Sequence, residues 1–563
     1  MGRREIQALG LISGAALALR LVYAFHHEVD PDEPQHLHVA WAWTQGLTQY
    51  RDIFDNHAPL FHLLSAPLAA LVGESPRILL DMRLAMLPLY LATLWGTYVL
   101  GRLTHSRRAG AWAAVLAGLA PVFFLKSVEY RTDDLWMALW ILALVVLLKG
   151  PLTWRRGLAA GILFGAAIST SLKTVLLVSV LGASALALPI VLGSLRRAPS
   201  ADAVAGRLAA LCAGIVALPI GLAVFFGARH ALRPLFSDVV VHNCLPGLGR
   251  WSDPGGIALF APAVLMLLAA GRFVVKGRPP TESTRDLALL ALTSGLYLAA
   301  LNTIWPLYAQ QDLLPFVPLF GVVLVVLILD GWSRLDRSRS EGTKRRLPSP
   351  AWILTGIALL EIACLVRQEP PWVDGMKQET DLLAQVIRLT GPADPVLDLK
   401  GQAVFRRRPI HEVMETITRQ RIRRGFLPER IQERLIESGT CVVAGEIDRF
   451  PDRTQRFLEA NYLVVGEVRV AGRFLAPPAA DLAGKAATGA PVRFAVTIPA
   501  RYAIITETGA ASGSLDDKPY GGPRFLAPGE HTFAPAPSGQ RLALIWARAV
   551  ERGFSPFTSS SRN

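Results

Sequence analysis

Acidic side chains of this 563-residue sequence gather in short stretches between long apolar segments. The richest are Asp30-Pro31-Asp32-Glu33 and Glu129-Tyr130-Arg131-Thr132-Asp133-Asp134, and Asp55 and His57 lie between them. Such carboxylates could accept a proton from a hydroxyl or hold a divalent cation, because both tasks need an anionic oxygen close to the reacting group. The alternative is structural, since acids are also favoured at helix N-termini.

Two basic side chains stand out because they are surrounded by apolar residues. Arg20 lies inside the first apolar segment, and Lys173 lies between two later ones. An ionisable side chain at membrane depth is costly, so Arg20 is expected to have a partner such as a lipid phosphate. The alternative for both residues is that a long side chain simply reaches the headgroup region.

The elements that position these residues are predicted membrane helices. Hydrophobic residues make up 52% of the chain and charged residues only 18%, with a mean hydropathy of +0.36. A soluble chain of this length carries about a quarter charged residues. Apolar runs of membrane-spanning length predict about eleven helical spans. They cover roughly 6–25, 78–100, 109–126, 134–149, 157–171, 174–192, 208–227, 256–271, 286–304, 312–330 and 351–367.

Charge alternates between successive loops. Arginine pairs such as Arg107-Arg108, Arg155-Arg156 and Arg196-Arg197 mark one set of loops, which the positive-inside rule places in the cytoplasm. The acidic loops then face outward, and an odd number of spans places the tail from about 368 outside as well. We therefore predict an inner (plasma) membrane protein with a cytoplasmic N-terminus and a periplasmic tail. The formal net charge of +14 belongs to these loops and does not indicate nucleic-acid binding.

The predicted fold class is a polytopic α-helical membrane protein with a C-terminal extracytoplasmic α/β domain and a small β module. The transmembrane domain covers 1–367, and its first outer loop, 26–77, contains two short amphipathic helices expected to lie at the membrane surface. The α/β domain covers 368–475, an Ala-, Pro- and Gly-rich linker 476–490, and the β-sandwich-like module 491–563. Residues 1–24 also fit a cleaved signal peptide, but the span parity works with this segment retained.

Several familiar kinds of site receive no support. The sequence has no Walker loop, GxGxxG, HExxH or GxSxG where it would matter, which weighs against ATP-driven transport and common hydrolases. The four cysteines form no CxxC pair, and a bridge between Cys244 and Cys441 is left open. The basic runs 406–408 and 419–424 of the tail are expected to be solvated, with anionic lipid headgroups as the alternative. The tail holds no acid or nucleophile cluster, so we expect it to recognise an acceptor or stabilise the outer face.

The order of these features resembles the C-type glycosyltransferases. The similarity is carried by the first span, Asp32-Glu33, an Ala- and Trp-rich helix ending near Gly46, and then Asp55, His57 and Pro59-Leu60 before the second span. It is strongest over about 15–175 and weaker to 367. The most similar groups are protein O-mannosyltransferases, lipid A aminoarabinose transferases and bacterial family 39-like enzymes.

The resemblance implies an inverting hexosyl- or pentosyltransferase that moves one sugar from a polyprenyl-phosphate donor to a hydroxyl of a glycan, lipid or protein on the outer face. Asp32 matches the base that accepts the hydroxyl proton, and Glu33 is its expected catalytic neighbour. Arg131, Lys173 and Arg20 are the expected ligands of the donor phosphate. The expected substrate-binding residues are Asp55, His57, Tyr130, Asp133, Tyr308 and Gln311.

The implied chemistry needs no metal, because fixed Lys and Arg side chains can neutralise a phosphate leaving group. A divalent cation at Asp30, Asp32 and Asp133 stays open. We expect Asp30 and Asp32 to point in different directions, because Pro31 between them fixes its own φ. His57 stands where aminoarabinose transferases carry Lys, and the segment from Tyr308 to Gln311 lacks their basic residue, so the donor sugar is not predicted.

Two other functional classes remain. A transporter or flippase of lipid-linked saccharides would show broken helices and charges near the membrane midplane. A non-catalytic glycan-binding membrane protein would not need the chemistry of Asp32. Membrane lipids are expected partners in every case, and nucleic acid in none.

Overall fold

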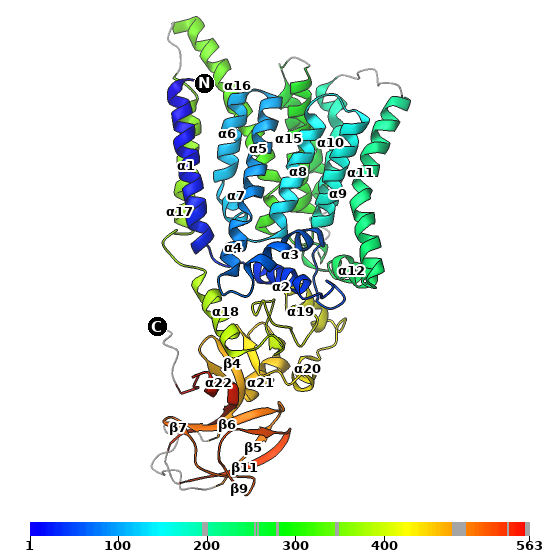
Figure 1. The fold of residues 1–563 in the computed structure, drawn as a ribbon. Coiled ribbons are helices and arrows are strands. Elements are labelled where there is room, and N and C mark those ends of the chain that lie inside the picture. The colour runs from blue at the N-terminus through cyan, green and yellow to red at the C-terminus, as the bar shows by residue number, and fades with distance from the viewer. Residues whose placement is uncertain are drawn as a thin grey trace. The chain divides into compact units, whose positions relative to one another are not determined.

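The computed structural model describes residues 1–193, 201–252, 255, 258–276, 278, 281–343, 348–475, 491–536 and 540–557. The chain forms two compact units. The first comprises Met1–Glu33, Asn56–Leu68 and Leu79–Met376, and the second comprises Pro34–Asp55, Ala69–Ile78 and Lys377–Asn563. The first unit is built of helices, and the second contains the named β-strands (Figure 1).

The helices of the membrane part follow the apolar segments of the sequence. Their bounds are α1 Arg3–His26, α2 Asp32–Thr44, α3 Leu60–Val72, α4 Ile78–Leu84, α5 Leu87–Thr104, α6 Arg107–Leu119, α7 Pro121–Lys126, α8 Thr132–Leu148, α9 Trp154–Thr170, α10 Lys173–Leu192, α11 Ala201–Ala228, α12 Leu232–Phe236, α14 Phe260–Val275, α15 Glu282–Thr303, α16 Phe316–Thr343 and α17 Ala351–Gln368. A π-helical turn η1 (Ser237–Val241) and two 3₁₀ turns, η2 (Gly249–Ser252) and η3 (Gln310–Leu313), lie between them.

Seven of the described helical segments are long and apolar enough to cross a membrane. They are Arg3–His26, Ile78–Thr104, Lys173–Leu192, Ala205–Ala228, Glu282–Thr303, Phe316–Ser338 and Ala351–Gln368. This confirms a multi-pass membrane protein. The other predicted spans fall on α6 with α7, on α8, on α9 and on α14, which are shorter. The number of eleven therefore stays a prediction.

Prolines interrupt two of the predicted spans. The segment 109–126 is divided into α6 and α7 at Pro121, and α4 gives way to α5 just before Pro88. Proline lacks the amide hydrogen and clashes with the preceding turn, so a helix breaks there or starts afresh. Each break lies close to the residues of the candidate site, because α7 ends at Lys126 and α4 carries Arg83.

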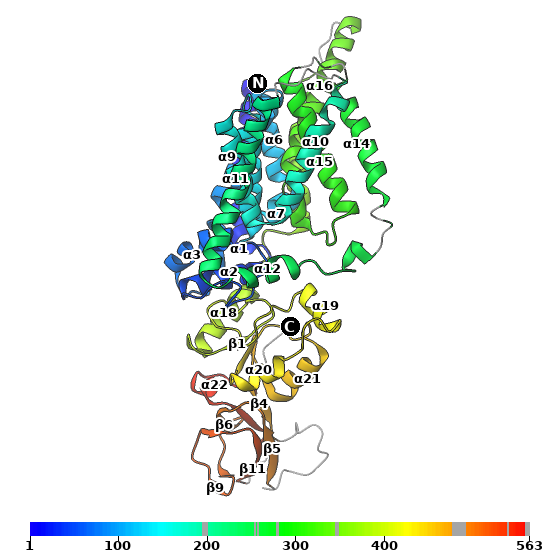
Figure 2. The ribbon, with the colours of Figure 1, turned by 90° about the vertical axis from the view of Figure 1, so that its right-hand side faces the viewer.

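The basic and acidic loops lie at opposite ends of the helices of the first unit. At one end Glu5 of α1 accepts hydrogen bonds from Arg108 and Trp112 of α6, at 2.7 and 2.8 Å. At the other end His27, just after α1, contacts Glu129, just after α7. The short helices α3 and α12 also lie at the end opposite the N-terminus (Figure 2). The separation agrees with the charge pattern, while the side that faces the cytoplasm stays a prediction.

Glycines allow a close contact between α9 and α11 in the first unit. Gly161 and Gly165 of α9 face Gly214 and its neighbours on α11, where any Cβ atom would collide with backbone of the opposite helix. Small residues four apart let two membrane helices approach until their backbones touch, which maximises van der Waals contact where lipid offers no hydrophobic drive. This packing holds α9, which leads directly to Lys173 at the start of α10.

The second unit contains an eight-stranded and a four-stranded sheet. The larger follows the order β1-β2-β4-β12-β6-β10, with β3 paired to β4 and β7 to β6, and the smaller follows β5-β11-β8-β9. The strands are β1 Val396–Leu397, β2 Val442–Ala444, β3 Tyr462–Val465, β4 Val468–Phe474, β5 Val492–Val496, β6 Ala500–Thr506, β7 Gly509–Ala510, β8 Gly513–Leu515, β9 Lys518–Pro519, β10 Arg524–Leu526, β11 Gly529–Pro535 and β12 Leu542–Trp546. The helices are α18 Lys377–Leu389, α19 Thr416–Arg423, α20 Ile431–Glu437, α21 Asp452–Asn461 and α22 Ala547–Glu551.

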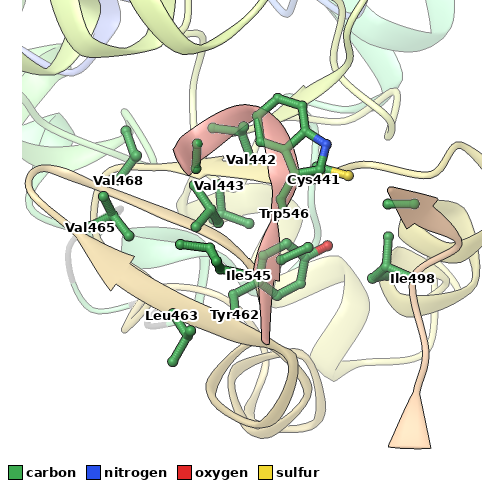
Figure 3. Packing of buried hydrophobic residues seen from close by; sticks show 14 of the residues in the cluster. Cys441, Val442, Val443, Tyr462, Leu463, Val465, Val468, Ile498, Ile545 and Trp546 are labelled. Atoms are coloured by element: carbon green, nitrogen blue, oxygen red, sulfur yellow. The ribbon is translucent and has the colours of Figure 1, made fainter. Parts of the chain in front are cut away.

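The segments before and after the predicted linker share one sheet. The linker, 476–490, lies outside the described residues. On either side of it, β4 and β12 pair antiparallel, with Leu544 opposite Arg473. Val443, Leu463 and Ile545 belong to one buried hydrophobic cluster, whose packing Figure 3 shows. The two predicted parts of the tail therefore have a common core.

Candidate active site

Arg131 is the centre of a buried ion-pair cluster in the first unit. Its side chain is only 2% exposed, and it stands just before α8. Four carboxylates surround the guanidinium: Asp30 at 2.6 Å from Nη1, Asp32 at 2.5 Å from Nη2, Glu129 at 3.3 Å from Nη1 and Asp133 at 3.2 Å from Nε. A planar guanidinium carries five N–H donors, so it can hold several carboxylates in fixed directions. The sequence stretches 30–33 and 129–134 thus meet at one cation.

The expectation that Asp30 and Asp32 point in different directions is wrong. Both carboxylates face Arg131, one on each terminal nitrogen. Pro31 fixes its own φ, but the chain turns there so that Oδ1 of Asp30 accepts the amide hydrogen of Asp32 at 3.0 Å. This bond caps the start of α2 and places both carboxylates on one side of the turn. Asp32 is the first residue of α2, with its side chain 17% exposed.

Lys126 is a second cation of the cluster. Its Nζ lies 3.0 Å from Asp30 and 2.6 Å from Glu129. Burial opposes ionisation of Asp30, yet the charges of Arg131 and Lys126 hold the pKa of its carboxyl below the usual value. For Glu129 burial dominates and raises its pKa, although His27 and Arg131 oppose the shift. The pKa values of Asp30 and Glu129 are therefore shifted in opposite directions although both acids contact Arg131, because Glu129 is more deeply buried.

Glu33 is fully buried and its two oxygens are occupied. Arg83 donates to both of them, at 2.8 Å from Nε and 2.6 Å from Nη2. The backbone amides of Tyr130 and Asp30 donate to them as well, at 2.7 and 3.1 Å. Arg83 also donates to the carbonyls of His27 and Glu28. This geometry ties the loop that carries Asp32 to the loop that carries Arg131, and it leaves Glu33 no opening toward a substrate.

Lys173 lies at the first position of α10, beside two acids. Its Nζ is 2.5 Å from Asp312 and 3.7 Å from Asp133, and it sits 5.6 Å from the ring centre of Trp136. The Lys173 side chain is 28% exposed, far more than Arg131. The hydrogen bond from the hydroxyl of Tyr297 to the Asp312 carbonyl, 2.9 Å long, fixes the turn that presents Asp312.

Arg20 bonds to the end of α7. It donates to the hydroxyl of Ser127 at 2.6 Å, to the carbonyl of Phe124 at 3.1 Å and to the carbonyl of Ser127. Its guanidinium also lies 4.2 Å from the ring centre of Tyr90. These bonds satisfy carbonyls that the end of a helix leaves without partners. Arg20 therefore holds α7 against α1, which sets the position of the loop from Ser127 to Arg131.

The remaining predicted site residues differ in their surroundings. Tyr130 is buried, donates its hydroxyl hydrogen to Ser65 at 2.6 Å and packs on Phe61. Tyr308 is 43% exposed, and Gln311 is half-buried on η3. His57 is half-buried in the first unit. Asp55 belongs to the second unit, where it is buried and accepts hydrogen bonds from the amides of Gln35 and Gln49.

Sequence reasoning missed several members of the cluster. Arg83 and Lys126 fall inside the predicted spans 78–100 and 109–126, and Asp312, at the start of the predicted span 312–330, was not among the candidate site residues. A signal for Asp312 was present, since it directly follows the segment 308–311 that was compared with the aminoarabinose transferases. The available signal for Arg83 and Lys126 was that each is an ionisable residue close to the end of an apolar run.

The described residues do not offer a metal site. No group of three or more His, Cys, Asp or Glu side chains among them could hold a metal ion. Arg131 and Lys126 occupy the positions among the carboxylates that a cation would need. The residues therefore do not fit the divalent cation left open by the sequence. Among the described residues the four cysteines are free.

These features define a multi-pass helical membrane protein with the C-type glycosyltransferase fold. In particular, the chain is similar to ArnT from Cupriavidus metallidurans, with a TM-score of 0.53 and 14% identity for the apo structure, over 82% of this chain and 97% of that chain. The same protein bound to undecaprenyl phosphate gives a TM-score of 0.52, with the same identity and coverage. The apo oligosaccharyltransferase from Archaeoglobus fulgidus gives 0.50 at 12% identity, over 94% of this chain and 76% of that chain.

No family model and no curated protein matches the sequence. The likeness to solved structures confirms the fold that the resemblance predicted.

Proposed function

We propose that the protein is an inverting glycosyltransferase that moves one sugar from a polyprenyl-phosphate donor to a hydroxyl acceptor at the outer face of the membrane. The observation that carries the proposal is the ion pair between Asp32 and Arg131, in a chain with the C-type fold. Asp30 and Asp32 are both partly exposed, and Asp32 is the one whose position resembles that of the base of this fold. The likeness to ArnT bound to undecaprenyl phosphate supports a carrier-linked donor.

Asp32 is the proposed general base. As the acceptor oxygen forms its bond to the anomeric carbon, its proton passes to the Asp32 carboxylate. The bond from the anomeric carbon to the phosphate oxygen breaks on the opposite face, and its electron pair leaves with the polyprenyl phosphate. The sugar is therefore transferred with inversion. The proton on Asp32 then passes to solvent or to the departing phosphate.

Lys173 is the proposed ligand of the donor phosphate. It is more exposed than Arg131, and it pairs closely with Asp312 at 2.5 Å and more loosely with Asp133 at 3.7 Å. A lysine is a compact charge on a flexible stem and can turn toward an incoming phosphate. The negative charge of the phosphate would then take over part of the stabilisation that Asp312 and Asp133 now give to the Lys173 ammonium. Charge stabilisation at the leaving oxygen would lower the barrier for bond cleavage.

We assign Arg131 and Glu33 to positioning in place of the direct roles expected from the sequence. Arg131 is almost fully buried and already holds four carboxylates. Its effect on the reaction would come through Asp32, whose direction it fixes. Glu33 acts one step further away, through Arg83 and the amide of Tyr130.

A purified-protein assay with a panel of polyprenyl-phosphate sugars tests the proposal. We expect the protein to consume one of the donors, to release polyprenyl phosphate and to glycosylate an added glycan, lipid or protein. Movement of an intact lipid-linked saccharide across vesicles without bond cleavage would instead support a flippase. Binding of a glycan with neither outcome would support the non-catalytic class.

A further inference from the structure

A cavity of about 370 Å³ lies at the end of the first unit that is opposite the acidic cluster. Its walls come from the end of α5, the start of α15 and the last turns of α16 within the described residues. The volume falls in the range of small-ligand sites. Neither the proposed reaction nor its donor uses this region, so the cavity needs its own explanation.

The lining of the cavity is basic. Arg278, Arg334 and Arg337 line it together with His105, and Asp330 is the single carboxylate among the described lining residues. Three guanidinium groups against one carboxylate leave an excess of two positive charges, without counting the histidine. Hydroxyl groups of Thr281, Ser283 and Thr284 add neutral donors. A mixture of guanidinium and hydroxyl donors is suited to the oxygens of a phosphate.

Asp330 organises the lining and does not neutralise it. It accepts a hydrogen bond from His105 at 2.9 Å and pairs with Arg278. Arg278 also donates to the carbonyl of Val274, so its guanidinium is fixed from two sides. Arg334 is exposed and has no ion-pair partner among the described residues, so its charge is available to a ligand.

A second cavity, of about 320 Å³, adjoins the first. The two share His105 and Ser333 as lining residues. The second is lined by Leu329, Trp332 and Pro350 together with polar side chains, among them Arg108 and the carboxylate of Asp336. Both cavities are therefore mainly polar, and Leu329, Trp332 and Pro350 offer apolar contacts beside the arginines of the first.

The cavities lie at the ends of candidate membrane spans. The segments Glu282–Thr303 and Phe316–Ser338 are both apolar enough to cross a bilayer, and both contribute lining residues. The level of the membrane at which such helices end is that of the lipid headgroups. We propose that the cavity between α5, α15 and α16 binds the phosphate of an anionic phospholipid headgroup. The site is separate from the proposed donor site and does not depend on the proposed reaction.

Native mass spectrometry of the purified full chain with added phosphatidylglycerol tests this proposal. We expect retained phosphatidylglycerol and little phosphatidylcholine. Arg334→Gln should weaken phosphatidylglycerol binding roughly fivefold, because one arginine near a lipid surface contributes about 1 kcal/mol. The double variant, with Arg337→Gln added, should weaken the binding by the square of that factor. Arg334 is exposed and Arg337 is near the end of α16, so both variants should fold.

Arg155→Gln is the matched control, because Arg155 is an exposed arginine at the basic start of another helix and lines neither cavity. Its lipid binding should equal that of the unaltered protein. An equal loss in this control, or equal retention of phosphatidylcholine, would overturn the proposal. Competition by inorganic phosphate at millimolar concentration, without retained lipid, would identify free phosphate as the ligand and would also overturn it.

Discussion

At the scale of single residues, the burial of Arg131 among four carboxylates determines what each acid can do. Asp30, Glu129 and Asp133 share its charge with Asp32, and Lys126 adds a second cation. The carboxylates hold the guanidinium in place, and the guanidinium in turn fixes the direction of Asp32. A base held in one direction needs little reorganisation as the proton moves.

Replacing Arg131 should damage stability as well as activity. Arg131→Ala leaves four buried or half-buried carboxylates without their common partner, and breaking a buried ion pair typically costs 3 to 5 kcal/mol. We expect a lower unfolding temperature in detergent and loss of transfer. Arg131→Lys should recover only part of the stability, since one ammonium cannot hold Asp30 and Asp32 in two fixed directions. Unchanged stability in Arg131→Ala would contradict the positioning role.

Lys173→Ala should weaken donor binding, and it should also lower stability because it leaves the buried carboxylate of Asp312 without its lysine. The ammonium is partly exposed, and hydrogen bonds to charged groups contribute about 2 kcal/mol, so donor affinity should fall roughly thirtyfold. Lys149→Ala is the matched control, because Lys149 is an exposed lysine at the other end of α8. Donor titration of the two variants measures the effect. Equal donor affinities of the two variants would contradict this role and would support the alternative that the Lys173 side chain merely reaches the headgroup region.

His27 should make stability depend on pH. Burial alone would lower its pKa, but the bonds to Glu129 and Glu369 raise it above the usual 6.5. A raised folded-state pKa means that the stabilisation is complete below 6.5 and is lost as the pH rises through the folded value. The unfolding temperature should fall over that interval, and less in His27→Gln. The control is His26→Gln, whose ring bonds to the Val22 carbonyl in its own helix. If the unfolding temperature depended on pH in the same way in both variants and in the unaltered protein, the role of His27 would be refuted.

At the scale of elements, the apolar runs were enough to predict most helices. Length and hydropathy identify a membrane helix because the bilayer demands internal hydrogen bonding. The spans 78–100 and 109–126 were predicted as uninterrupted, although the breaks at Pro88 and Pro121 were readable from the sequence. The pairing of Arg83 with Glu33 was not, because two residues fifty positions apart meet only through the packing of the helices that carry them.

Ile545 of β12 should contribute strongly to the stability of the tail. It is fully buried between β4 and β6, and truncating such a side chain typically costs 2 to 5 kcal/mol. Ile545→Ala should therefore speed hydrogen exchange in β4 as well as in β12. Val464→Ala is the control, because Val464 lies on β3 with half of its surface exposed. Faster exchange after 491 alone, with β4 unaffected, would contradict a shared core.

At the scale of the whole molecule, the composition and the apolar runs predicted the membrane class, and the resemblance predicted the fold. Both are confirmed by the candidate spans and by the likeness to solved structures. The shared sheet of the tail was beyond the sequence, because strand periodicity shows which face is buried and not which strand is the neighbour. A deletion from 491 onward would remove β12 from beside β4, so it is a poor test of acceptor recognition.

The transfer reaction of Asp32→Asn, measured with the polyprenyl-phosphate sugar that the unaltered protein consumes, tests the central claim most directly. The amide keeps the shape of the side chain but cannot accept the proton, so transfer should fall roughly a hundredfold or more while donor binding persists. Asp81→Asn, an exposed acid on α4, is the matched control and should retain activity. Full transfer by a folded Asp32→Asn protein would contradict the assignment of the base.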